Sequence, residues 1–130
     1  MAGLRAQLAA SDAVLFCTPE YAGALPGSFK NLLDWTVGGG EIYGKPVAWI
    51  NVSSVAAPTG GADAHASLAT VLGYVGADVS EAACARAPMS RSAVGPDGTV
   101  TDPHVRQQLG DVLTALARHA RTRVAEGTSE

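Results

Sequence analysis

Uninterrupted apolar segments alternate with segments of helical spacing along this 130-residue chain. Residues 13–17 (AVLFC) and 46–52 (PVAWINV) are almost wholly apolar, which is typical of strands that are covered on both faces. A weaker apolar run over residues 77–83 predicts a third strand. The pattern therefore predicts a sheet that lies inside the molecule.

The predicted helices fill the gaps between these strands. They cover residues 4–8, residues 28–36, a segment with Asp63 in its first turn, and a final segment that begins at Asp102 (N-cap) and Pro103. The resulting order is α-β-α-β-α-β-α. Alternation of this kind is typical of a parallel sheet with helices on its faces, the α/β class.

Two loops that follow predicted strands, residues 18–27 and 53–61, are rich in glycine and small residues. Ligands of open parallel sheets bind beyond the carboxyl ends of the strands, so we expect the two loops to lie side by side at one rim. Glycine lets backbone N–H groups approach a ligand, and each loop leads into a helix N-terminus, which favours negative charge. The sequence thus predicts a ligand-binding rim.

Composition narrows the class of protein. The formal net charge of −3 argues against a nucleic-acid binder, which normally presents a basic face. No apolar run approaches the ~20 residues of a membrane span, and the N-terminus has no signal-peptide pattern. We therefore expect a cytoplasmic protein without membrane contacts, with one domain over residues 1–125 and a polar tail over residues 126–130.

Reactive side chains are sparse and scattered. Cys17 and Cys84 have no CxxC partner, and we expect both to be buried and reduced. The three histidines lack the spacing of a metal site, and no catalytic triad or carboxylate pair is present. The sequence therefore predicts neither a metal site nor a catalytic side chain.

Residues 18–35 (TPEYAGALPGSFKNLLDW) carry the most specific pattern in the chain. This stretch resembles the NADPH-dependent FMN reductase family, flavodoxin-like flavoproteins that include quinone, chromate and azo-dye reductases. Weaker similarities follow in the same order at residues 44–47 (GKPV), 60–61 (GG), 73–79 (GYVGADV) and 97–98 (DG). The resemblance covers residues 4–117, of which the first motif is the specific part.

The resemblance implies a flavodoxin-like three-layer sandwich around a parallel sheet. It implies an FMN-dependent NAD(P)H oxidoreductase that passes hydride through flavin N5 to quinones or similar small acceptors. FMN and NADPH (or NADH) are the implied cofactors, and a homodimer is the implied assembly. Because the flavin carries the difficult chemistry, the protein needs no catalytic side chain of its own.

The residues implied for cofactor binding come from both glycine-rich loops: Thr18, Pro19, Glu20, Tyr21, Ala22, Gly23, Ser53, Ser54, Gly60 and Gly61. For Glu20 and Tyr21, a role at a subunit interface is an equal alternative. The helix residues Lys30, Asn31 and Asp34 fit a structural role, and Trp35 fits the core or a dimer interface.

Two departures from the family pattern matter. Ala22 stands where the family usually has Asn. The family also begins with a strand, a phosphate-binding loop, a helix and a second strand, roughly 50 residues with no counterpart here. We therefore expect an N-terminally incomplete sheet of three strands, with the strand at residues 13–17 exposed as an edge that favours self-association.

Two other functions stay open. The first is a truncated flavodoxin-like remnant that binds no flavin and serves as an interaction or assembly module. The missing phosphate loop favours this function, and the intact first motif disfavours it. A stand-alone flavodoxin-like electron carrier is disfavoured because such carriers are usually more acidic than −3. An upstream strand followed by a Gly-Ser-x-Arg-like loop would favour the enzyme over the remnant.

Overall fold

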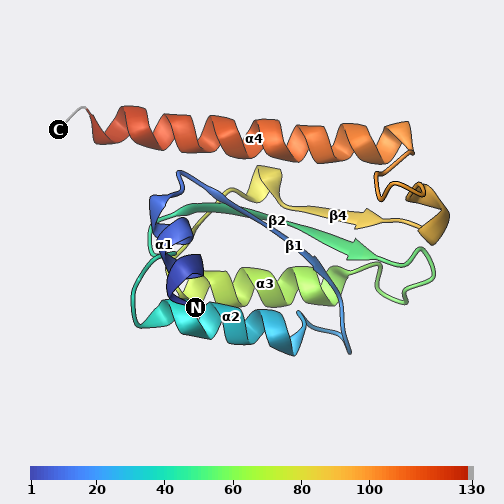
Figure 1. Ribbon diagram of the computed structural model, residues 1–130, viewed down its shortest axis with the longest axis horizontal. Coiled ribbons are helices and arrows are strands. Elements are labelled where there is room, and N and C mark those ends of the chain that lie inside the picture. Colours follow the sequence, from blue (N-terminus) through green and yellow to red (C-terminus); the bar gives the residue numbers. More distant parts are fainter. Residues whose placement is uncertain (129–130) are drawn as a thin grey trace.

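The sheet is built around strand β2 (Pro46–Ser53), which is buried along almost its whole length in the computed structural model of residues 1–128 (Figure 1). Strand β1 (Val14–Pro19) pairs with it in parallel, with Val14 opposite Val47 and Pro19 opposite Val52. The two apolar runs are thus strands, as predicted. Burial of β2 on both faces explains why its sequence has no polar alternation.

The other side of β2 carries two short parallel strands instead of one. Strand β3 (Asp78–Val79) pairs at the start of β2, and strand β4 (Ala85–Pro88) pairs at its end. Between them lies a single 3-10 turn, η1 (Glu81–Ala83), and the pairing register shifts by its three residues. The prediction of one strand over residues 77–83, and of three strands in all, is therefore wrong.

The reason for this error is local. Ala83 N–H donates to the Ser80 carbonyl at 2.9 Å, and Cys84 N–H donates to the Glu81 carbonyl at 3.1 Å, which closes the turn. Small residues such as alanine have low β propensity and pack well in a tight turn, so an apolar count could not separate strand from turn here.

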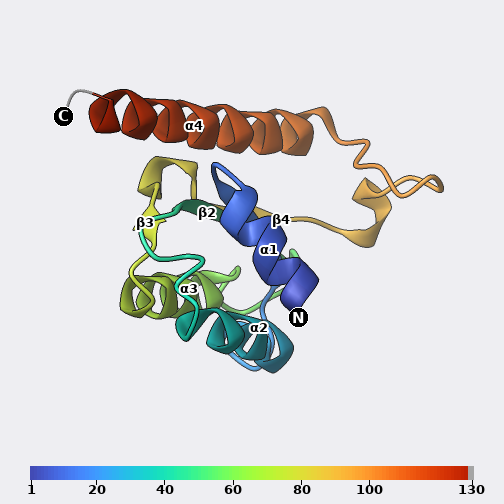
Figure 2. The same ribbon diagram turned by 60° about the vertical axis from the view of Figure 1, so that its left-hand side comes forward.

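Helices α1 (Ala2–Ala10), α2 (Gly27–Val37) and α3 (Ala62–Tyr74) cover one face of the sheet, and α4 (Pro103–Gly127) covers the other (Figures 1 and 2). The largest core cluster joins the first three helices to β1 and β2; its buried members are Leu8, Phe16, Leu25, Leu33, Ile42, Val47, Trp49, Leu68 and Leu72. All four predicted helices are present. None of the helices within residues 1–128 combines the length and the apolar character that a membrane span needs.

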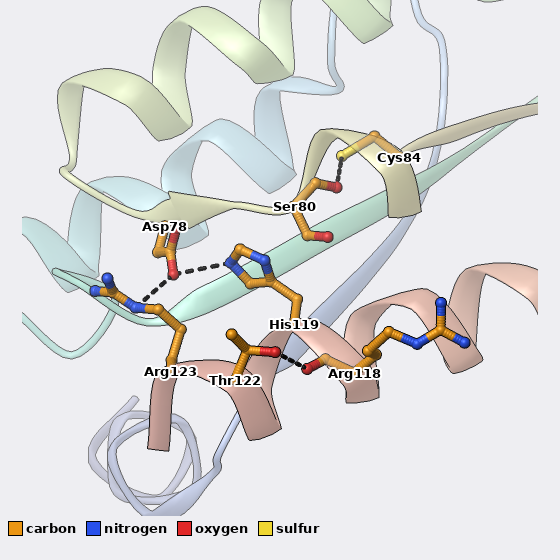
Figure 3. A network of polar contacts seen from close by, with 7 residues as sticks. All are labelled: Asp78, Ser80, Cys84, Arg118, His119, Thr122 and Arg123. Atoms are coloured by element: carbon orange, nitrogen blue, oxygen red, sulfur yellow. Dashed lines mark hydrogen bonds and ion pairs between the residues drawn. The ribbon is translucent and has the colours of Figure 1, made fainter. Parts of the chain in front are cut away.

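Polar contacts fix both ends of α4. At its start, the Asp102 carboxylate accepts hydrogen bonds from the N–H groups of His104 (2.8 Å) and Val105 (3.4 Å), as its predicted N-cap role requires. Towards its end, Asp78 Oδ2 lies 2.9 Å from His119 Nε2 and 3.0 Å from Arg123 Nε (Figure 3). These half-exposed contacts fix the position of the helix more than they add stability.

Among the residues that the structure describes, 1–128, strand β1 has a neighbouring strand on one side only. Its Cys17 is exposed, so the prediction that this thiol is buried is wrong. The reason is that α4 packs over β2, β4 and η1, and leaves the far side of β1 uncovered. Cys84 is partly buried, and burial raises the pKa of its thiol against the opposing hydrogen bond from the Trp49 backbone, so it stays protonated.

Candidate functional site

The carboxyl ends of β1, β2 and β4 lie at one edge of the sheet, the right-hand side of Figure 1. A cavity of about 730 Å³ opens there, a volume typical of small-molecule sites. Its walls come from the ends of β1 and β2 and from the segments that follow β2 and β4. The lining residues are Pro19, Val52, Ser53, Ser54, Val55, Met89, Ser90, Arg91 and Val94.

A carboxylate from the first loop joins the two glycine-rich loops. Glu20 Oε1 accepts a hydrogen bond from the Thr59 hydroxyl at 3.0 Å, and Glu20 Oε2 accepts one from the Ala64 N–H at 2.9 Å. Ala64 lies in the first turn of α3, where N–H groups have no partner within the helix. Glu20 thus caps α3 from outside and complements its dipole. The predicted adjacency of the two loops is confirmed.

Asn51 also contributes to the junction of the two loops. It is fully buried on β2, and its Nδ2 donates to the Thr18 carbonyl at 3.3 Å. Its Oδ1 lies so close to Gly61 that a Cβ at position 61 would sit 1.9 Å away. Gly61 also has φ of +82°, a conformation that favours glycine. This position therefore requires glycine on two independent grounds.

Two buried polar atoms at the rim have no hydrogen-bond partner within residues 1–128. They are Asn51 Oδ1 and Ser53 Oγ, and both residues lie at the end of β2. Leaving a buried polar atom unpaired costs about 1–3 kcal/mol, so such atoms mark places where a ligand or water completes the structure.

The tip of the first loop is a tight turn. Tyr21 and Ala24 exchange two backbone hydrogen bonds of 3.0 and 3.1 Å. Between them, Ala22 and Gly23 have φ of +50° and +74°, the signs of a type I′ turn. Within residues 1–128, Ala22 is the only non-glycine residue with positive φ. The position that usually carries Asn in the resembled family is thus one where alanine is strained.

The ten residues implied for cofactor binding fall into three places. Pro19, Ser53 and Ser54 line the cavity. Four others form or flank the junction between the loops: Thr18, Glu20, Gly60 and Gly61. Tyr21, Ala22 and Gly23 form the exposed tip, where the Tyr21 side chain is 63% exposed.

Sequence reasoning missed the third wall of the cavity, residues 89–94. These residues follow β4, whereas the last predicted strand ends at residue 83, so the sequence pattern places no strand end next to them. It also missed Asn51, which stands inside an apolar run. A polar residue in a strand otherwise covered on both faces was the available signal.

A histidine close to the rim stays neutral. Burial, and then the positive charge of Arg86, lower the pKa of His65. Its Nδ1 accepts a hydrogen bond from the Trp49 indole N–H at 3.0 Å, which requires the unprotonated nitrogen. Arg86 itself donates to the Thr59 carbonyl at 3.3 Å. Arg86 thus contacts the second loop, and neither His65 nor Arg86 lines the cavity.

The motif residues on α2 lie away from the cavity. Lys30 and Asp34 form an exposed ion pair of 2.8 Å within the helix. Trp35 is 54% exposed, so it does not belong to the core. The expected core role is therefore wrong, and a role at a subunit interface stays a prediction.

Comparison with known proteins identifies the pattern. The sequence profile described as NADPH-dependent FMN reductase matches residues 1–90. An NADPH azoreductase from Bacillus sp. (strain OY1-2) is 42% identical over 72 residues, which are 52% of this chain and 39% of that protein. An NAD(P)H-dependent FMN reductase from Pseudomonas aeruginosa is 42% identical over 52 residues, 38% of this chain and 28% of that protein.

Solved structures agree on the fold. FerB, a flavoenzyme NAD(P)H:(acceptor) oxidoreductase from Paracoccus denitrificans, superposes with a TM-score of 0.75 and 33% identity, over 89% of this chain and 65% of that chain. A flavodoxin, WrbA-like protein from Agrobacterium tumefaciens gives a TM-score of 0.62 at 22% identity, over 90% of this chain and 71% of that one. The fold is thus flavodoxin-like, as predicted. The chain spans less than half the length of the curated relatives and about two thirds of FerB.

The strain at Ala22 yields the first prediction. Ala22→Asn creates an Asn-Gly pair suited to the type I′ turn, and we expect it to raise the free energy of unfolding by about 0.5–1 kcal/mol. The measurement is urea unfolding followed by circular dichroism. Ala56→Asn, in an exposed loop without positive φ, is the matched control and should change stability little. Equal effects of the two substitutions would show that the turn stores no strain.

The two hydrogen bonds that Glu20 accepts yield the second prediction. Glu20→Gln keeps the size of the side chain but removes its charge and one acceptor, so we expect a loss of about 1 kcal/mol and faster hydrogen exchange at the Ala64 amide. Asp12→Asn is the control, because the exposed Asp12 carboxylate caps no helix. Unchanged protection of Ala64 would mean that Glu20 does not hold the two loops together.

Proposed function

Because the chain belongs to the NADPH-dependent FMN reductase family, we propose that its rim binds FMN and that the protein passes hydride from NADPH or NADH to a quinone or a similar small acceptor. We further propose that it works in the cytoplasm as a homodimer. The observation that carries the proposal is the cavity at the ends of β1, β2 and β4, which adjoins the family's most specific motif.

The lining of the rim supports this proposal. The cavity combines apolar residues with Ser53 and Ser54, and Asn51 Oδ1 and Ser53 Oγ near the end of β2 have no hydrogen-bond partner within residues 1–128. The proposed contacts of the first loop, from Thr18 to Gly23, are mainly backbone groups. Gly60 and Gly61 bring the second loop close without side chains that would block it. When bound, the flavin would supply the hydride chemistry, and the protein would supply position and access.

The structural roles found above divide the proposed site into two parts. Pro19, Ser53 and Ser54 are the proposed cavity contacts. Glu20 and Asn51 act indirectly, because their hydrogen bonds hold the loops that carry those contacts. No side chain of this chain is assigned a proton-transfer or nucleophilic role.

A second candidate is a flavin-free interaction module. The observation that favours it is the unpaired edge of β1, which offers backbone N–H and C=O groups to another strand. The exposed Cys17 lies on this same strand. Flavin binding separates the two candidates.

The flavin test is a titration of the purified chain with FMN, followed by its visible spectrum and by quenching of flavin fluorescence. We expect saturable binding and, with flavin bound, oxidation of NADPH in the presence of a quinone. Gly61→Ala should abolish binding, because its Cβ would press on Asn51 Oδ1. Gly110→Ala, where a Cβ meets no atom within 4 Å, is the control. No binding at millimolar FMN would reject the proposal for this chain.

The proposed homodimer has its own test. Light scattering should give a mass above that of the monomer, because the edge of β1 and the half-exposed Trp35 both leave apolar surface to cover. Cys17→Lys places a charge on the edge strand and should yield monomers if copies pair through β1, whereas Trp35→Lys should do so if they meet through α2. A monomeric mass for the unaltered chain at working concentration would refute self-association.

A further inference from the structure

A second cavity, separate from the rim, lies where the edge of the sheet is interrupted. Strand β3 pairs with β2 as far as Val47 and β4 pairs with it from Ile50, so Trp49 has no paired residue on this side within residues 1–128. The η1 turn projects towards α4 (Figures 1 and 2), where Ala83 shares a core cluster with Leu116. Because the chain moves to the α4 side here, it leaves a hollow of about 370 Å³ on the α3 side.

The less exposed part of this lining consists of Trp49, His65 and Cys84. The indole N–H of Trp49 can only donate, and it donates to His65 Nδ1 at 3.0 Å, with the two rings edge to face and their centroids 5.2 Å apart. Nδ1 is therefore unprotonated, and the neutral ring carries its proton on Nε2. This Nε2–H has no hydrogen-bond partner within residues 1–128. The Cys84 thiol, by contrast, donates to the Ser80 carbonyl at 3.3 Å (Figure 3).

The rest of the lining limits the chemistry of a ligand. Ala69, Gly73 and Val79 add surface without polar side chains. The exposed Glu81 carboxylate has no ion pair within residues 1–128 and therefore disfavours anions. Although a histidine, a cysteine and a glutamate all occur here, no three such side chains within residues 1–128 are placed to hold a metal ion. What remains is a neutral organic molecule that accepts a hydrogen bond from His65.

We propose that this cavity is a second ligand site, which takes a small neutral aromatic molecule carrying a hydrogen-bond acceptor for His65 Nε2–H. Its volume lies at the lower end of the range for small-molecule sites, which suits one ring or two fused rings. The Trp49 and His65 rings offer edge and face contacts to such a molecule. The inference does not rest on the proposed function, because none of these residues lines the cavity at the rim.

The test compares quinoline, which is neutral near pH 7 and accepts a hydrogen bond at its nitrogen, with N-methylquinolinium. Methylation blocks the acceptor and adds a positive charge with little change in shape. The readout on the full chain is the pair of indole N–H resonances in NMR spectra: that of Trp49 should shift saturably with quinoline, and that of Trp35, outside this cavity, should not. We expect quinoline to bind about tenfold more tightly than its methyl derivative.

Two pairs of variants test the site. His65→Asn keeps an acceptor for the Trp49 indole but removes the ring donor, so it should weaken quinoline binding about fivefold, whereas His104→Asn at an exposed position of α4 should not. Gly73→Leu places a side chain where a Cβ meets no atom within 4 Å, so it should fill the cavity and abolish binding. It should not lower the melting temperature, because leucine is the better helix former. Gly110→Leu, at an equally open position of α4, is its control.

A final measurement with FMN distinguishes this cavity from the rim. Quinoline should shift the Trp49 indole resonance equally with and without excess FMN, and displacement by FMN would overturn the proposal. Equal or tighter binding of N-methylquinolinium, equal effects within either pair of variants, or no shift at millimolar quinoline would also overturn it. Quinoline binding in a chain that does not bind FMN would support this site while the proposed flavin function fails, so the two failures are distinguishable.

Discussion

The parallel pairing of β2 on both sides is the constraint on which the rest of the molecule depends. It directs the carboxyl ends of β1, β2 and β4 to one edge, so that three loops far apart in sequence meet there. The η1 turn preserves this arrangement, because it absorbs three residues between β3 and β4 and lets pairing resume beside Ile50. Without that second pairing, residues 89–94 would not reach the rim.

Sheet pairing alone does not hold the loops in place. Polar side chains do so, and some polar atoms beside them are left without hydrogen bonds, which costs free energy locally. Glu20 caps α3 from another loop, and Asn51 ties the end of β1 to β2. Nearby, Asn51 Oδ1 and Ser53 Oγ are buried without partners within the described residues 1–128, and Ala22 has positive φ. Departures from local rules gather at this edge, which is typical of binding sites. The opposite edge, where Asp78 meets His119 and Arg123, holds one such atom, Glu41 Oε2 in the loop before β2.

The sequence was informative where one physical effect dominated. Apolar runs located β1 and β2 because burial on both faces removes polar residues, and Asp102-Pro103 located the start of α4 because capping chemistry is local. The segment from 77 to 88 was misread because small residues suit both strand and turn. The exposure of Cys17 and the bridge from Glu20 to Ala64 depend on which elements lie alongside, which no local pattern encodes.

The match to the family profile covers only part of the cavity. Pro19 and residues 52–55 lie inside the segment that matches the family profile, and they form two of its walls. The third wall lies almost entirely outside that segment and carries the only charge. Loops at strand ends vary more readily than the strands that hold them, because they contribute little to the core. A scaffold of this kind can therefore change the lining of its cavity through a single loop while the strands that hold the loop stay the same.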